Sequence, residues 1–303
     1  MKIGMVFGGG FARGAAQCGF IKGMMEYIDK NDITLISSSS IGSINALGFS
    51  NNKMDYLENT YKTTNIASIK NLRLNLKNKI VDDIINYITA DGIELSIPLY
   101  VSGTCLNDLS THYFYLDQKT DIEEIRKAIN ITLTFPFVNG LFKRYNKKFY
   151  LDGGATDNIP VYPFKYYDVD LLIILHFYPR YTPPVDLIEK RQNTTIIDID
   201  VSAHIDNIST YAFTQSNLNV LFEKGYEQGK RFGEEVLKEY DIKVINEKSK
   251  EYMQKELEVR KNRKNNINAA IFFNKLQQGR HLGWNIHWFW QVVEHLELIK
   301  LVQ

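Results

Sequence analysis

The chain has 303 residues, 44% hydrophobic and 13% aromatic, with no long tract of glycine, serine or proline. This composition predicts a large folded core and excludes a mainly disordered chain. Its 36 basic residues nearly balance its 35 acidic ones, so the net charge of +1 gives no global electrostatic reason to bind nucleic acid. A charged partner must therefore meet a local patch.

Cysteine use and hydropathy suggest a cytoplasmic protein. Cys18 and Cys105 belong to no CxxC or Cys/His pattern, which predicts reduced thiols and neither a disulfide nor a metal site. The apolar runs at residues 3–7 and 171–175 are far shorter than the roughly 18 residues that a membrane span needs. We therefore expect any membrane contact to be peripheral, and the sequence leaves a homodimer open.

The first third of the chain alternates strand and helix signals. Residues 3–7 read as a buried strand, and a helix follows, with apolar residues at positions 15, 18, 21, 25 and 28. Residues 33–39 form the next predicted strand and lead into an apolar helix start at 44–49. Later strands are expected at 99–102, 112–116, 149–151 and 171–176, with a helix at 121–129. This rhythm predicts a three-layer α/β/α fold around a mostly parallel sheet.

Composition also suggests how the chain is divided. We expect a main domain over residues 1–240, in which residues 51–98 form a cap. Residues 241–303 form a C-terminal segment that is first charge-dense and then aromatic, and it contains all three tryptophans.

A glycine-rich turn follows the first strand. It reads Gly8-Gly9-Gly10-Phe11-Ala12-Arg13-Gly14 and opens the first helix, where unpaired N–H groups and the helix dipole favour negative charge. Glycines suit such a turn because it needs backbone angles that side chains disfavour. The alternative is a tight turn without a ligand.

The second strand ends in a run of serines. Ser38-Ser39-Ser40-Ile41-Gly42 is similar to the GxSxG nucleophile elbow, with Ser38 in place of the first glycine. In such an elbow, small residues two positions before and after the serine prevent a clash between strand and helix. Ser40 is the favoured nucleophile because it alone has Gly42 at the required offset. The alternative is that these serines only cap the following helix.

An acid followed by glycines ends another short strand. Asp152-Gly153-Gly154 would project a carboxylate from the edge of the sheet, with a flat backbone beside it. The alternative interpretation is an ordinary Asp-Gly turn.

Together and in this order, the three motifs resemble the patatin-like phospholipases over about residues 3–180. That family combines a glycine-rich oxyanion loop containing a basic residue, a GxSxG elbow and an Asp-Gly-Gly or Asp-Gly-Ala acid. By position, the resemblance implies that Ser40 is the nucleophile and Asp152 its base. It also implies an oxyanion loop made of Gly9, Gly10, Phe11 and Arg13. Phe11 stands where the family usually has glycine, which predicts a narrowed site or an altered turn.

The resemblance implies hydrolysis of carboxylic esters in phospholipids or lysophospholipids through an acyl-enzyme, without a metal or cofactor. Such a mechanism requires a desolvated Asp152 with raised proton affinity, because an ordinary aspartate is a weak base for an alcohol. For Arg13, which can hold the loop or add positive potential, we favour the structural role.

Three other interpretations compete with this one. A histidine triad would have to use His176 or His204, although nothing in the sequence places either beside Ser40. Dinucleotide binding would need GxGxxG and an acid after the second strand, but Phe11 and the serine run occupy those positions. A silent lipid-binding or regulatory module would not require Ser40 and Asp152.

The C-terminal segment also suggests a way to reach a membrane. The basic cluster of Arg260, Lys261, Arg263 and Lys264 precedes a tryptophan-rich stretch, and both residue types favour the headgroup region of a bilayer. Burial of this stretch against the main domain, or in a homodimer, is the favoured alternative.

Overall fold

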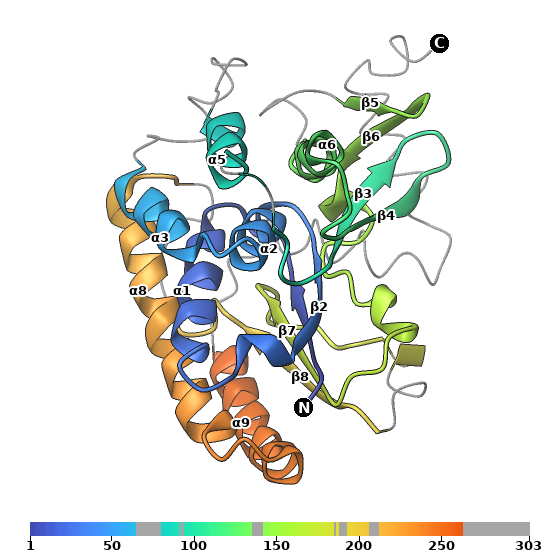
Figure 1. The fold of residues 1–303 in the computed structure, drawn as a ribbon. Helices are drawn as coiled ribbons and strands as arrows, with labels where there is room; N and C mark the ends of the chain where they lie inside the picture. Colours follow the sequence, from blue (N-terminus) through green and yellow to red (C-terminus); the bar gives the residue numbers. More distant parts are fainter. Residues whose placement is uncertain are drawn as a thin grey trace. The chain divides into compact units, whose positions relative to one another are not determined.

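A computed structural model describes residues 1–64, 80–90, 92, 94–134, 142–184, 186–187, 193–205 and 212–262 (Figure 1). The chain divides into a compact unit, Met1–Arg263, and a second unit, Lys264–Gln303. The tryptophan-rich stretch belongs to the second unit and lies outside the described residues, as do residues 65–79 of the predicted cap.

One mixed sheet forms the centre of the first unit. Its strand order is β5-β6-β3-β2-β1-β7-β8, and β4 pairs with β3 off this path. The pairs joining β3, β2, β1, β7 and β8 are parallel, whereas β4 and β6 run antiparallel to β3. The strands are β1 (Ile3–Phe7), β2 (Ile33–Ser38), β3 (Leu99–Cys105), β4 (Ser110–Leu116), β5 (Lys143–Tyr145), β6 (Lys148–Asp152), β7 (Leu171–His176) and β8 (Thr195–Asp200).

The predicted α/β class is confirmed. Every residue of β1 and β7 is buried, as expected for central parallel strands covered on both faces. Two strands were not predicted, β5 and β8. The α-helices are α1 (Gly14–Met24), α2 (Ile41–Ser50), α3 (Met54–Thr63), α5 (Ile80–Ile88), α6 (Ile122–Thr132), α8 (Gln215–Phe232) and α9 (Ile242–Asn262).

Helices α1 and α8 lie side by side, with their backbones in contact (Figure 1). A Cβ atom at Gly225 would clash with the carbonyl of Ala16, and one at Gly19 would clash with that of Phe222. Helix α3 packs against the same pair and lies in this helical layer. Among the described helices, none is both long and apolar enough to cross a bilayer.

Two strands end facing each other along one edge of β3. Ser38, the last residue of β2, pairs with Val101, and Asp152, the last residue of β6, pairs with Gly103. Because β2 runs parallel to β3 and β6 antiparallel, their carboxyl ends approach from opposite directions. The residues that follow β2 and those that end β6 therefore meet.

Candidate active site

Ser40 occupies the sharp corner between β2 and α2. Its backbone angles, φ 51° and ψ −131°, lie in a region that costs a non-glycine residue energy. Two residues on, a Cβ atom at Gly42 would clash with the carbonyl oxygen of Phe7, so only glycine lets the helix approach β1 this closely. The Ser40 hydroxyl makes no capping bond to α2. This corner has the geometry of a nucleophile elbow rather than of a simple helix cap.

The neighbouring serines are placed differently. The Ser38 hydroxyl donates to the carbonyl oxygen of Tyr100, at 3.2 Å. The hydroxyls of Ser39 and Ser43 are buried and find no partner among the described residues. Within this run, Ser40 is the residue whose hydroxyl reaches a carboxylate.

Asp152 is that carboxylate. The Ser40 Oγ donates to Asp152 Oδ2 at 2.7 Å, and the Gly154 N–H donates to Asp152 Oδ1, also at 2.7 Å. Burial raises the pKa of Asp152 to about 7, although both hydrogen bonds act in the opposite direction. A carboxylate with that pKa is far better matched to a serine hydroxyl than an ordinary aspartate.

The acid loop fits tightly against its surroundings. A Cβ atom at Gly153 would clash with Ser102, and one at Gly154 would lie 2.6 Å from Asn158 Oδ1. The N–H of Asp152 donates to the carbonyl oxygen of Thr134 at 2.9 Å. These contacts fix the carboxylate at the end of β6.

The glycine-rich turn passes directly beside Ser40. A Cβ atom at Gly9 would lie 2.8 Å from the Ser40 Cβ, so the lack of a side chain allows this approach. The Gly9 N–H donates to the Asn158 carbonyl at 3.1 Å, whereas the Gly10 N–H has no acceptor within the described part of the chain. Phe11 adopts φ 54°, the left-handed conformation that glycine adopts more easily.

Arg13 fastens this turn to the segment after β7. Its Nη1 donates to the carbonyl oxygen of Phe177 at 3.0 Å, and its Nε donates to that of Gly10 at 3.3 Å. The guanidinium also lies 4.9 Å from the centre of the Phe177 ring. These contacts join the glycine-rich turn to the segment after β7.

Two further residues support the site without having been predicted. Asn158 Nδ2 donates to the Gly9 carbonyl at 2.9 Å and to the Tyr178 hydroxyl at 2.6 Å, tying the glycine-rich turn to the acid loop. The Thr132 hydroxyl accepts the N–H of Ser40 at 2.8 Å. For Asn158, the sequence feature that could have indicated this role is the segment Asn158-Ile159-Pro160, which follows soon after Asp152. The sequence around Thr132 contains no motif that would have indicated its contact with Ser40.

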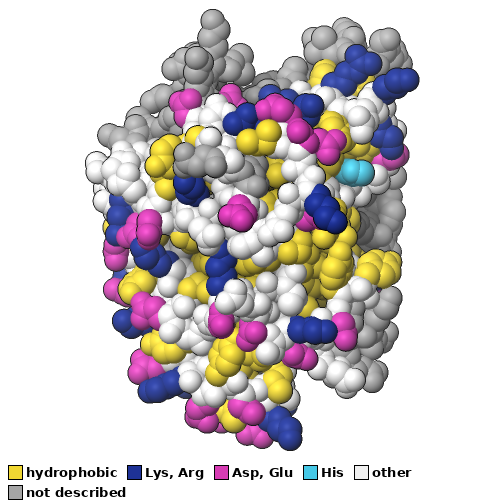
Figure 2. Space-filling model, viewed as in Figure 1, with side chains coloured by type: hydrophobic (Ala, Val, Ile, Leu, Met, Phe, Trp, Pro, Cys, Tyr) yellow, Lys and Arg dark blue, Asp and Glu magenta, His cyan; other side chains and the backbone are white. Residues whose placement is uncertain are grey.

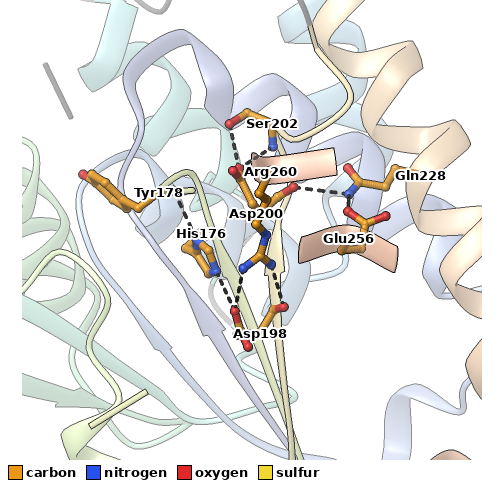
Figure 3. A network of polar contacts seen from close by, with 8 residues as sticks. All are labelled: His176, Tyr178, Asp198, Asp200, Ser202, Gln228, Glu256 and Arg260. Carbon is orange, nitrogen blue, oxygen red and sulfur yellow. Dashed lines mark hydrogen bonds and ion pairs between the residues drawn. The ribbon is translucent and has the colours of Figure 1, made fainter. Parts of the chain in front are cut away.

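The described histidines make no hydrogen bond to Ser40. His176 is buried at the end of β7, where its Nδ1 accepts the N–H of Tyr178 at 3.1 Å (Figure 3). Its Nε2 lies 3.4 Å from Asp198 Oδ2, and burial lowers the pKa of the ring. His204 pairs with Glu256 at 2.7 Å. Both rings belong to a polar network between β7, β8 and the last helices.

Arg260 belongs to the same network, which corrects its expected place in an exposed basic cluster. Only 5% of Arg260 is exposed, and its Nη1 lies 2.9 Å from Asp198 Oδ2 (Figure 3). A second bond joins its Nη2 to the Asp198 carbonyl oxygen at 2.9 Å. A guanidinium bound in this way cannot reach lipid headgroups.

Comparison with known proteins identifies the family of this chain. Two solved structures are similar at 13% sequence identity: VipD from Legionella pneumophila (TM-score 0.42) and the type III effector protein ExoU (TM-score 0.37). Each alignment covers 77% of this chain, which spans 66% of the VipD chain and 52% of the ExoU chain. The family model for patatin-like phospholipase matches residues 5–165. Because that match spans more than half of the sequence, the protein belongs to the patatin-like phospholipase family of lipid hydrolases.

Proposed function

We propose that the protein hydrolyses carboxylic ester bonds of phospholipids or lysophospholipids, with Ser40 as the nucleophile and Asp152 as its base. The observation that carries this proposal is the 2.7 Å hydrogen bond between the Ser40 hydroxyl and a buried carboxylate whose pKa is raised to about 7. A carboxylate ionised near neutral pH, and free of a cation in the described surroundings, is available to take a proton.

In the first half of the reaction, Asp152 takes the proton of Ser40 as its Oγ attacks the ester carbonyl carbon. The carbonyl π bond opens, and its electron pair becomes the oxyanion of a tetrahedral intermediate. Collapse of this intermediate breaks the bond to the alcohol oxygen, which receives the proton from Asp152 and leaves. Ser40 then carries the acyl group as an ester.

In the second half, water replaces the alcohol. Asp152 takes a proton from water as the water oxygen attacks the acyl carbon, and a second tetrahedral intermediate forms. Its collapse releases the fatty acid and returns the proton to the Ser40 oxygen. All bonds and protons in the two half-reactions are accounted for without an electron acceptor or a metal.

The oxyanion needs donors beside Ser40, and we assign the Gly10 N–H to this role. The Gly9 N–H donates to Asn158, whereas the Gly10 N–H has no acceptor within the described residues. Gly10 precedes a single 3₁₀ turn, Phe11–Arg13, that leads into the positive end of the α1 dipole at Gly14. One well-placed donor stabilises such a transition state by about 3 kcal/mol. In this assignment Gly9 makes room for Ser40, while Phe11 and Arg13 shape the loop.

The test is hydrolysis of a soluble short-chain ester and of phospholipid vesicles by the wild type, Ser40→Ala and Asp152→Asn. Each variant should lose activity by about 10⁴-fold or more, and the double variant should lose little beyond either, because the two groups act as one unit. A fluorophosphonate should label the wild type and not Ser40→Ala.

Ser39→Ala and Ser43→Ala are matched controls, because both hydroxyls are buried in the same segment. Both controls should keep activity and labelling. Full activity in Ser40→Ala, with label on Ser39 or Ser43 instead, would overturn the assignment.

A further inference from the structure

The β5–β6 hairpin concentrates positive charge. Lys143, Arg144, Lys147 and Lys148 lie within six consecutive positions, and all four are exposed. The chain as a whole carries a net charge of only +1. Figure 2 shows the basic side chains gathered over these two strands, at the upper right of the view. This hairpin is therefore a local patch of the kind that a charged partner requires.

Most of this charge is not neutralised by the rest of the described protein. Lys148 forms an ion pair with Asp108 at 3.5 Å. Lys143, Arg144 and Lys147 form no ion pair within the described ranges. Three exposed cations thus have no ion-pair partner within the described ranges, and the nearby carboxylate of Glu124 accepts a hydrogen bond from the Tyr145 hydroxyl at 3.4 Å.

The hairpin presents these cations on a defined backbone. Asn146 and Lys147 form its turn with φ 47° and 64°, as in a type I′ hairpin turn. On one face, the Tyr145 ring packs against Phe114, with 5.6 Å between ring centres, and against Tyr150, with 6.4 Å. Because the backbone is already fixed, binding of a charged surface orders little beyond the basic side chains.

The other face combines aromatic rings with a cation. Arg144 pairs in register with Phe149, so the two side chains share one face of the hairpin. Phe142 and Phe149 are partly exposed and form an edge-to-face pair, with 5.0 Å between ring centres. Aromatic and basic side chains side by side suit the headgroup boundary of a bilayer better than bulk water.

The hairpin is also close along the chain to Asp152, the proposed base. Strand β6 runs from Lys148 to Asp152, a distance of about 13 Å at the usual rise of a β-strand. A bilayer that contacts the hairpin tip therefore lies within a lipid's length of the Ser40–Asp152 pair. A nucleic acid partner would not account for this placement beside the active site of a phospholipase-family protein.

We propose that the β5–β6 hairpin docks the protein on bilayers that contain anionic lipids. The proposal rests on the proposed function, since it locates the surface through which that active site meets its substrate. Each cation contributes about a fivefold gain in partitioning to an anionic bilayer, so the three unpaired cations together account for roughly 100-fold. The attraction weakens as salt rises.

The experiment measures binding of the full chain to phosphatidylcholine vesicles with and without phosphatidylserine. The test variant is Lys143→Gln/Arg144→Gln/Lys147→Gln. The matched control, Lys238→Gln/Lys243→Gln/Lys250→Gln, removes the same charge from exposed positions in α9 and just before it. Hydrolysis of a soluble short-chain ester is measured for all three proteins, because none of these side chains contacts Ser40 or Asp152.

The wild type and the control should bind the phosphatidylserine vesicles, and the hairpin variant should bind them roughly 100-fold more weakly. All three should hydrolyse the soluble ester equally. Unchanged binding of the hairpin variant, an equal loss in the control, or binding to RNA without binding to vesicles would overturn the docking proposal. Absence of ester hydrolysis in the wild type would instead contradict the proposed function, and the vesicle measurement would still report on docking.

Discussion

Two aspartates, Asp152 and Asp198, are largely buried in this protein. Their surroundings shift their pKa values in opposite directions. Asp152, at the end of β6, contacts a hydroxyl and a backbone N–H, and burial raises its pKa to about 7. Asp198, in β8, is also largely buried, but the hydrogen bond from His176 and the Arg260 guanidinium outweigh burial, and its pKa is lowered. Since burial lowers the pKa of His176, Arg260 is the permanent cation of this group.

The difference shows that burial alone does not decide what an aspartate does. The ion pair with Arg260 gives Asp198 a structural role, because it joins β8 to α9. The lack of one among the described neighbours leaves Asp152 suited to accept a proton near neutral pH.

Removing Arg260, the cation paired with Asp198, should cause the largest decrease in the free energy of unfolding. Arg260→Met leaves the largely buried Asp198 without its permanent counter-charge, so we expect a loss of about 3 kcal/mol in the free energy of unfolding, measured by urea denaturation. Lys255→Met, in the same helix, breaks only the exposed pair with Glu235 and should cost under about 1 kcal/mol. Equal stability of the two variants would show that Arg260 acts as an ordinary surface residue.

Removing the charge from the other aspartate should stabilise the protein. Because the folded-state pKa of Asp152, about 7, exceeds its usual 3.8, the folded protein binds the extra proton and loses stability as pH rises between these values. Asp152→Asn removes this cost, so its stability gain should be absent near pH 4 and reach up to about 4 kcal/mol above pH 8. Ser40→Ala keeps the carboxylate and should show no such gain. A gain that is independent of pH would contradict the assigned cause.

The smallest effect concerns the wild type itself. If Asp152 must lose its proton to act, kcat/KM for a soluble ester should rise about tenfold per pH unit up to about pH 7 and then level off. A profile that is flat from about pH 5 to 8 would contradict a base with this pKa. The measurement should be made on the monomeric ester, because vesicle charge also changes with pH.

The sequence predicted the parts of this molecule that depend on local patterns. Continuous apolar runs marked β1 and β7, and the glycine and serine motifs marked both turns of the site. Strand β5 was missed because three residues in a basic hairpin carry no apolar alternation.

Contacts between distant residues were harder to predict. Ser40 and Asp152 were linked through family resemblance, whereas the physical cause of their approach is the pairing of both β2 and β6 with β3. Arg260 was placed in an exposed cluster because a run of basic residues does not reveal a partner 62 positions away.

The contact between α1 and α8 has a consequence for how the protein forms. The two helices come from opposite ends of the described chain: α1 is Gly14–Met24 and α8 is Gln215–Phe232. Their glycine-containing faces therefore meet only after a very long loop has closed. Such non-local contacts slow folding. During synthesis, α1 leaves the ribosome long before its partner exists, and the glycine-rich turn at its start lacks its final support. We expect the newly made chain to acquire a working lipid-hydrolysing centre only after α8 has been synthesised and has docked.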